Sequence, residues 1–423
     1  MNSGQRIVTI IDTKPEEFRK NLLSQKASND YILYDNWELS SKNIDWIIGW
    51  GKLDSFVCSA ENSNQFLFLD QWLNKHPDWR MGYINYDLKN QIEPSLCRKE
   101  KNTLPSDLIH FFVPEIVFIA KNNQIEAHYF PGTDIPVYER SSEKISFPSL
   151  NFSILTDKDT YLQKISYLKE RIVAGDFYEI NYCIEWQSDE PLDNPAAAYL
   201  GLQQSLQAPF SCYFQLDGIH LICNSPERFL KKSGSTLISQ PIKGTSSRFA
   251  QADLDQQSKE RLKNEKDLTE NVMIVDLVRN DLSQVAEKGS VKVSELAETY
   301  TFPQVHQLIS TIECRLAENV SFTDILKATF PMGSMTGAPK ISAMNHSEEI
   351  ETMHRDIYSG TVGYMTPEGD FDFNVVIRSL LHFSEKQKSY IRAGGAITID
   401  SDPEAEWKEC HLKAEKLIAF FNQ

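Results

Sequence analysis

The chain has 423 residues, of which 41% are hydrophobic and 11% are aromatic, and it carries a net charge of −16 at pH 7. These proportions exclude a disordered chain, and the negative charge argues against a nucleic-acid partner or an anionic membrane surface. The sequence has no apolar run of the ~18–20 residues that a membrane span needs, and no secretory signal pattern at its N-terminus. The seven cysteines are scattered without a C-x-x-C pair, so neither a zinc site nor a disulfide framework is indicated. We therefore expect a globular cytoplasmic protein with no membrane and no nucleic-acid partner.

Residues 1–150 are expected to be mostly β-structure. Short runs rich in β-branched and aromatic residues alternate with Asn, Asp, Lys and Pro clusters, a pattern typical of antiparallel strands and hairpins. The runs are RIVTII, YILY, WIIGW, QFLFLD, MGYINYDL, DLIHFFVPEIVFIA and IEAHYF. The stretch 132–158 contains Gly, Pro and Ser with little periodicity, which makes it the candidate linker to a second region, 151–423.

The second region mixes helices with strands. Apolar residues recur at helical spacing over 159–175, where Gly175 marks the end of the helix. Further helices are predicted over 253–285, 322–329, 337–350 and 403–421, and strands in FYEINYCIEWQ, APFSCYFQL, HLICN, STLISQ, 297–314, TVGYMTP, FNVVIRSLLHF and SYIRAGGAITI. Because strands and helices do not alternate strictly, the pattern favours an α+β fold with large antiparallel sheets and helices packed outside.

Two acidic pairs lie on predicted helices. Asp267 and Glu270 are three residues apart and therefore share one helix face. Glu406 and Glu409 repeat this spacing in the last helix, and Lys413 lies one turn beyond them. If the two pairs meet, their carboxylate oxygens suit Mg²⁺. Solvated helix faces with ion pairs fit the same spacing, so the spacing alone leaves both interpretations open.

Two short motifs contain further reactive groups. Lys243 follows a predicted strand and precedes Gly244, so its amine can act as a nucleophile or contact a substrate carboxylate. A nucleophilic amine needs a pKa below the ordinary value of about 10.4, which a neighbouring cation or burial would provide. Glu227 follows Pro226, whose restricted backbone can aim the carboxyl group into a cleft as a general acid or base. A solvated lysine, and a surface ion pair between Glu227 and Arg228, are the alternatives for these motifs.

Glycine-rich segments occur at 331–340 and at Gly394 and Gly395. The first, PMGSMTGAPK, resembles an anion-binding turn at the start of a helix. Neither a Walker loop nor a G-x-G-x-x-G motif occurs, so the sequence indicates no nucleotide cofactor.

Eight motifs, taken in their order along the chain, resemble the chorismate-utilising enzymes. They are SPERF, PIKGT, TENVMIVDLVRNDL, FPMGSMTGAPK, YSGTVGY, FNVVIR, AGGAI and DSDPEAEWKE. The resemblance covers about residues 155–420 and extends more loosely to GYINYD at 82–87. It implies an anthranilate synthase component I-like fold with the sheets packed face to face. In this fold 1–150 is a variable region and 151–423 the chorismate-binding catalytic region of one globular unit.

Lys243 distinguishes branches within this family. Anthranilate, isochorismate and salicylate synthases usually have Ala at the matching position, whereas aminodeoxychorismate synthases usually have Lys. The chain therefore most resembles the branch of aminodeoxychorismate synthase component I. This resemblance implies Mg²⁺-dependent amination of chorismate to 4-amino-4-deoxychorismate for p-aminobenzoate and folate synthesis. Anthranilate synthase component I is the alternative enzyme, and a non-catalytic chorismate-binding homologue is the alternative of another class.

The resemblance also implies roles for individual residues. Lys243 matches a covalent nucleophile, and Glu227 matches the acid that protonates the leaving hydroxyl. The carboxylates that match the family's Mg²⁺ site are Glu270 and Glu409 as direct ligands, with Asp267 and Glu406 acting through water. The groups that match substrate contacts are Thr245, His306, Thr336, Tyr358, Arg378, Gly394, Gly395 and Lys413. The charge of Mg²⁺ is expected to help lower the pKa of Lys243.

Two positions depart from the family pattern. Glu179 stands where isochorismate and salicylate synthases have a water-activating Lys and other members usually have Gln, and the resemblance gives it no role. Ala396 replaces a frequent Gly. No cysteine lies in the G-x-C-x-G context of a glutaminase nucleophile, so we expect ammonia to come from a separate glutamine amidotransferase subunit.

Overall fold

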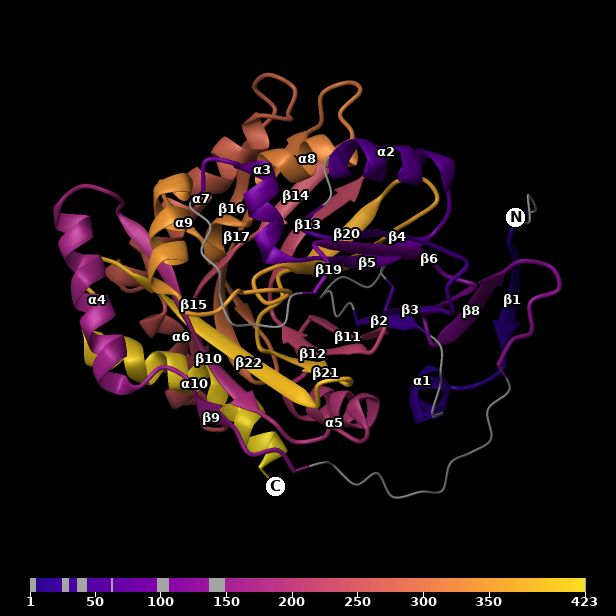
Figure 1. The fold of residues 1–423 in the computed structure, drawn as a ribbon, viewed down its shortest axis with the longest axis horizontal. Coiled ribbons are helices and arrows are strands. Elements are labelled where there is room, and N and C mark those ends of the chain that lie inside the picture. Colours follow the sequence, from indigo (N-terminus) through magenta and orange to yellow (C-terminus); the bar gives the residue numbers. More distant parts are fainter. Residues whose placement is uncertain are drawn as a thin grey trace.

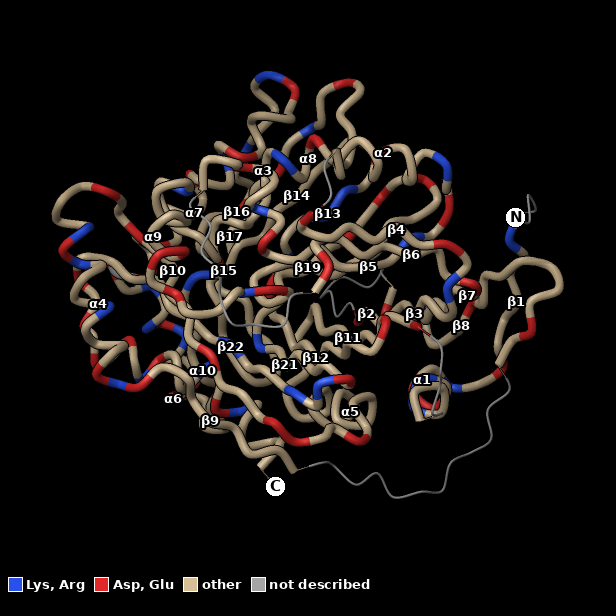
Figure 2. The backbone as a smooth tube through the Cα atoms, in the orientation of Figure 1, with Lys and Arg blue, Asp and Glu red and all other residues tan. Residues whose placement is uncertain are grey.

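The computed structural model describes residues 5–24, 30–35, 44–61, 64–96, 106–136 and 149–422. Within these ranges, no helix combines the length and the apolar character needed to cross a bilayer. Acidic and basic residues are interspersed along the helices and loops (Figure 2). The strands form two antiparallel sheets, one of 12 and one of 10 strands, with helices around them (Figure 1).

The 12-stranded sheet contains β1 (Ile7–Ile11), β2 (Tyr31–Asp35), β3 (Trp46–Trp50), β7 (Ile116–Lys121), β8 (Gln124–Tyr129), β9 (Ser153–Ile154), β10 (Glu179–Ser188), β11 (Phe210–Leu216), β12 (Ile219–Ser225), β18 (Gly337–Ala338), β21 (Ser379–Phe383) and β22 (Lys388–Ile397). Their order is β1-β8-β7-β3-β2-β11-β12-β21-β22-β10-β18, with β9 beside β10. At one edge this sheet therefore ends with β10, which begins at the Glu of GDFYE, and β18, which lies within MTGAP.

The 10-stranded sheet contains β4 (Asp54–Cys58), β5 (Arg80–Ile84), β6 (Ile109–Val113), β13 (Arg228–Ser233), β14 (Thr236–Gln240), β15 (Ile242–Ser247), β16 (Lys292–Thr301), β17 (Val305–Arg315), β19 (Thr361–Met365) and β20 (Phe371–Asn374). Their order is β15-β17-β14-β13-β20-β19-β5-β6-β4, with β16 beside β17. Strands before and after residue 150 pair in both sheets, as β2 does with β11 and β5 does with β19.

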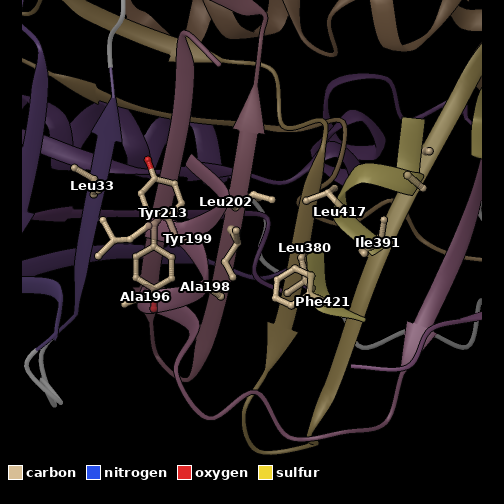
Figure 3. Packing of buried hydrophobic residues seen from close by; sticks show 14 of the residues in the cluster. Leu33, Ala196, Ala198, Tyr199, Leu202, Tyr213, Leu380, Ile391, Leu417 and Phe421 are labelled. Carbon is tan, nitrogen blue, oxygen red and sulfur yellow. The ribbon is translucent and has the colours of Figure 1, made fainter. Parts of the chain in front are cut away.

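The helices are α1 (Pro15–Ser24), α2 (Gln65–Lys75), α3 (Lys89–Ile92), α4 (Lys158–Val173), α5 (Pro195–Leu206), α6 (Ala252–Arg261), α7 (Glu265–Ser283), α8 (Phe322–Thr329), α9 (Lys340–Ile350) and α10 (Pro403–Phe421), with 3-10 turns η1 (Tyr86–Leu88) and η2 (Gly333–Met335). Side chains of α5 and α10, including Leu202 and Leu417, pack with Tyr213, Leu380 and Ile391 of the 12-stranded sheet (Figure 3). These helices therefore shield one face of that sheet from water.

Strand alternation divides the apolar side chains between two cores. On β2, Tyr31 and Leu33 belong to the outer core beneath α1 and α5. Ile32 and Tyr34 of the same strand belong to a core that also contains Tyr83 of β5, a strand of the other sheet. The two sheets therefore pack face to face, and the predicted α+β architecture is confirmed.

Three local predictions need correction. QFLFLD is part of helix α2 and not a strand, because Leu69 and Trp72 lie on one buried helical face while Phe68 is exposed. The single helix predicted over 253–285 is two helices, since the Asn264 side chain accepts a hydrogen bond from a backbone N–H and caps the start of α7. FNVVIRSLLHF is interrupted at 375–378, where the chain passes from one sheet to the other.

Of the candidate linker, 137–148 lies outside the described residues, and β9 lies within its end.

Candidate active site

The centre of the site is a buried amine between two carboxyl groups. Lys243 lies on β15, the edge strand of one sheet, and is only 9% exposed. Its Nζ lies 2.6 Å from Oε1 of Glu179, which begins β10 near the edge of the other sheet. Glu227 is close enough for the charge of Lys243 to act on its carboxyl group. The site is therefore formed where the edges of the two sheets approach each other.

Glu227 lies where the chain crosses from one sheet to the other. Ser225 ends β12 and Arg228 begins β13, and the carbonyl of Glu227 accepts a hydrogen bond from the backbone N–H of Val375 in the second crossing. Ser334 Oγ donates to Glu227 Oε1 at 2.7 Å. Burial raises the pKa of Glu227 to about 7, although the bond from Ser334 and the charge of Lys243 act in the opposite direction. This carboxyl group can therefore deliver a proton near neutral pH.

The protein groups around Lys243 raise its pKa, whereas the expected lowering includes the charge of bound Mg²⁺. Burial acts to lower the pKa of Lys243, but the negative charges of Glu179 and Glu270 and the hydrogen bond to Glu179 together raise it above the ordinary value. The amine therefore rests as an ammonium group, and a proton must leave it before it can act as a nucleophile.

The four predicted metal ligands face the site from two helices. On α7, Asp267 packs beside Gly244, and Glu270 acts through its charge on Lys243. On α10, Glu406 Oε1 accepts a hydrogen bond from Ser401, and its Oε2 lies close to Gly395, where an added Cβ would be 3.3 Å away.

Glu409 is also engaged, since its Oε1 lies 2.7 Å from Nζ of Lys413. Across the described part of the chain, no three His, Cys, Asp or Glu side chains converge closely enough to hold a metal ion. The carboxylate oxygens are nevertheless the donor type that Mg²⁺ prefers, so they fit this metal in chemistry.

Arg378, Lys413 and Gly394, which are predicted to bind carboxylates, lie around the middle of α10. Arg378 is the last residue of the second crossing, and its guanidinium donates to the carbonyl of Lys413 at 2.9 Å. Burial lowers the pKa of Arg378, and the negative charge of Glu409 acts in the opposite direction. Lys413 Nζ donates to the carbonyl of Gly394 at 2.8 Å.

Gly394 and Gly395 pair with residues of β10 just after Glu179. In the strand register, Gly395 lies opposite Tyr182 and Gly394 opposite Cys183. A Cβ added at Gly394 would lie 2.6 Å from the Cys183 sulfur, so only glycine fits there. Together with Arg378 and Lys413, these glycines extend the site along β10.

Three other residues that are predicted to contact the substrate lie in different surroundings. Thr336 is buried beside η2, where its hydroxyl donates to the carbonyl of Gly333 at 3.2 Å. His306 is buried, but its Nε2 lies 3.0 Å from Asp255 of α6, so its side chain is engaged outside the Lys243 cluster. Thr245 is exposed on the edge strand.

Two residues of the centre had no predicted role. In the sequence, Glu179 stands out only as a departure from the family pattern, and Ser334 is only one residue of the glycine-rich segment. Their partners are 64 and 107 residues away in the chain, so local spacing could not identify these contacts. The one available signal was a carboxylate at a position where a neutral Gln is usual.

A small cavity adjoins Glu227. Its volume is about 20 Å³, enough for roughly one water molecule and too small for a ring-shaped substrate. Its polar walls include Ser334, Ser239 and Asp281, and Asp281 pairs with Lys340 at 2.6 Å. The cavity therefore has room for one water molecule beside Glu227 but does not accommodate the substrate.

A family model described as chorismate binding enzyme matches residues 32–419. Aminodeoxychorismate synthase component 1 of Escherichia coli is 37% identical over 80% of this chain and 76% of its own length. A probable chloroplastic aminodeoxychorismate synthase of rice is 34% identical over 79% of this chain, which spans 42% of that longer protein.

Among solved structures, anthranilate synthase component I of Streptococcus pneumoniae superimposes with a TM-score of 0.78 at 22% identity, covering 99% of this chain and 100% of that one. The menaquinone-specific isochorismate synthase of Escherichia coli gives a TM-score of 0.76 at 17% identity, covering 100% and 97%. At these identities the two structures establish a shared fold. The family match over nearly the whole chain and the 37% identity to the bacterial relative lead to one conclusion: this chain belongs to the chorismate binding enzymes.

Proposed function

We propose that this enzyme converts chorismate and ammonia into 4-amino-4-deoxychorismate, the precursor of p-aminobenzoate in folate synthesis, in the cytoplasm. The observation that carries the proposal is the buried amine of Lys243 next to the carboxyl group of Glu227. The name of the Escherichia coli relative, aminodeoxychorismate synthase component 1, supports the same reaction. It also fits a second component, for which we propose a separate glutamine amidotransferase subunit that supplies ammonia.

The proposed chemistry explains why a lysine is needed. Direct attack of ammonia on C2 of chorismate would place the amine at the wrong carbon. In the proposed route Lys243 attacks C2, the ring double bonds shift, and the C4 hydroxyl leaves with a proton from Glu227. Ammonia then attacks C4 and expels the lysine, so two successive displacements place nitrogen at C4.

The other side chains would bind and orient the ring. Arg378, Tyr358, Lys413 and the backbone at Gly394 and Gly395 are proposed to hold the substrate carboxylates, and Thr336 to line the ring pocket. For Thr245 and His306, only the family resemblance supports a place in that pocket. Glu270 and Glu409, with Asp267 and Glu406 behind them, would hold Mg²⁺. When bound, the metal would neutralise the ring carboxylate as a Lewis acid.

Product identification tests this function. The purified chain is incubated with chorismate, Mg²⁺ and excess ammonium, and the products are identified by mass spectrometry. We expect a 4-amino product that an added lyase converts to p-aminobenzoate, and loss of its formation with a chelator. Direct formation of o-aminobenzoate would establish anthranilate synthase activity instead, and no consumption of chorismate would support a binding protein.

A further inference from the structure

Glu179 is a buried carboxylate whose role neither the fold nor the family resemblance explains. It is 1% exposed, and its Oε1 accepts a hydrogen bond from Nζ of Lys243 at 2.6 Å. Its other oxygen, Oε2, is buried without a hydrogen-bond partner in the described ranges of the chain. A buried carboxylate with one oxygen on an ammonium group and the other unused has the capacity to hold an additional proton.

The backbone holds Glu179 in this position. Glu179 and Ile180 pair with Ala338 and Gly337 of β18, and Ile180 also pairs with Ile397 of β22. A Cβ added at Gly337 would lie 2.1 Å from the carbonyl oxygen of Glu179, so the backbones of β10 and β18 are in close contact there. Because the strand is held from both sides, the carboxylate is positioned before substrate binds.

Lys243 requires a proton acceptor, and Glu179 is placed to be one. An ammonium group has no lone pair for attack on carbon. Three carboxyl groups face Lys243 from different elements, namely Glu179 of β10, Glu227 of the crossing after β12 and Glu270 of α7. Glu227 is proposed to protonate the leaving hydroxyl, and Glu270 is proposed to bind the metal.

We propose that Glu179 is the general base of this enzyme, which removes a proton from Nζ of Lys243 through their hydrogen bond before the amine attacks the substrate. This inference rests on the proposed function, because it assigns the proton that the nucleophile must lose. It gives a chemical role to a carboxylate at the position where the family usually has Gln or Lys.

The protons balance over the cycle. Glu179 takes one proton from Nζ, which leaves a neutral amine and a carboxylic acid. Nζ forms the bond to C2, the C4–O bond breaks, and Glu227 gives its proton to the departing hydroxyl, which leaves as water. Ammonia forms the bond to C4, and the C2–N bond breaks to release Lys243 as a neutral amine. Glu179 returns its proton to Nζ, and the proton lost from the new ammonium at C4 restores Glu227.

The test compares Glu179→Gln and Glu179→Asp with the native enzyme. We expect Glu179→Gln to lower kcat for the 4-amino product by about 10²-fold or more at pH 7, with KM little changed. Below about pH 7, where Glu227 keeps its proton, the kcat of this variant should rise about tenfold per pH unit, because only solvent can remove the proton below the pKa of the amine. Glu179→Asp keeps a carboxylate and should recover part of the rate and the native pH profile.

A matched control is Glu348→Gln, which makes the same change in another buried pair, where Glu348 Oε2 lies 3.1 Å from Lys89. It should leave the shape of the pH profile unchanged. Thermal unfolding of each variant verifies folding, and if Glu179→Gln does not fold, the pH profile of Glu179→Asp decides the question.

Two results would overturn the inference. One is a Glu179→Gln enzyme with native kcat and pH profile, and the other is a uniform loss at every pH that Asp does not restore. Lys243→Ala separates this failure from that of the proposed function. If Lys243→Ala still forms the 4-amino product, the nucleophile assignment fails, whereas if it is inactive while Glu179→Gln is native, only the general base is wrong.

Discussion

Two buried charge clusters in this molecule differ in how their charges are balanced. In one, Arg355 pairs with Glu351 at 2.7 Å and Arg392 pairs with Glu185 at 2.5 Å, so each of these two carboxylates has its own guanidinium. In the other, the single amine of Lys243 is faced by the carboxyl groups of Glu179, Glu227 and Glu270.

The first cluster supports the structure, whereas the second contains the reactive groups. The guanidinium of Arg355 also donates to the carbonyl of Met335 at 2.6 Å and to that of Asn181 at 2.7 Å, so the balanced cluster holds the η2 turn that carries Ser334. In the unbalanced cluster, burial of Glu227 outweighs the opposing charge of Lys243, and Glu227 retains its proton to about pH 7. Perturbed acids of this kind are typical of active sites.

The largest expected effect is on turnover. Lys243→Ala and Lys243→Arg should each lower formation of the 4-amino product by on the order of 10³-fold or more, because alanine has no amine and a guanidinium is not nucleophilic. Steady-state assays with chorismate, Mg²⁺ and ammonium measure this loss. If the arginine variant kept the native rate, charge alone would explain the lysine and covalent catalysis would be refuted.

The balanced cluster should control stability. Arg355→Ala removes a buried cation and leaves Glu351 without its guanidinium, so the free energy of unfolding should fall by about 3–5 kcal/mol. Denaturant titration measures this change. The control is Arg279→Ala, whose exposed pair with Asp276 should contribute less than about 1 kcal/mol. Equal losses in the two variants would contradict the distinction between the clusters.

The unbalanced cluster should instead reduce stability at high pH. The pKa of Glu227 rises from 4.5 to about 7 on folding. As pH rises from the first value to the second, the unfolded state gives up its proton while the folded state keeps it, so folding is penalised by a total of roughly 3 kcal/mol.

Glu227→Gln removes this titration and should therefore stabilise the fold by up to roughly 3 kcal/mol at pH 9, and by less than about 1 kcal/mol at pH 5. The same variant should lose the amination activity, because Gln cannot donate the proton. Denaturant titrations at the two pH values measure the difference. A gain in stability that did not depend on pH would show that Glu227 does not carry the penalty.

The smallest effect is expected at the contact between β22 and α10. Gly395→Ala would place a Cβ 3.3 Å from Oε2 of Glu406, so the last helix must shift slightly. We expect a loss of about 1 kcal/mol in unfolding free energy and a measurable rise in the Mg²⁺ concentration required. Gly132→Ala is a comparison with open space around the added carbon, although its positive φ adds backbone strain of its own. A native Mg²⁺ requirement in Gly395→Ala would argue against a metal site beside this strand.

Much of the fold follows from local pattern. The helix predicted over 322–329 is α8 with the same bounds, since Ser321 and Asp324 form a capping box at its start. The misassigned QFLFLD segment shows the limit of this reasoning, because a short apolar run fits a strand or a helix equally well. Only its neighbours, against which Leu69 and Trp72 are buried, decide between the two.

In the active site, too, some features follow from the sequence and others from the tertiary structure. The residue types at 227, 243, 267 and 270 indicated acid, nucleophile and metal chemistry, because these functional groups depend on side-chain identity alone. The effect of the protein on the Lys243 pKa could not be predicted locally, since it depends on Glu179, which reaches the amine only where two sheet edges meet.

The amino-acid sequence by itself determined the family, the order of most helices and strands, and the set of reactive groups, because periodicity and side-chain chemistry are local properties. Tertiary structure alone decided which carboxylate holds the amine, which hydroxyl bonds Glu227 and which helix faces are buried. These contacts join residues far apart in the chain, and the strength of each charge depends on the burial that only the complete packing creates.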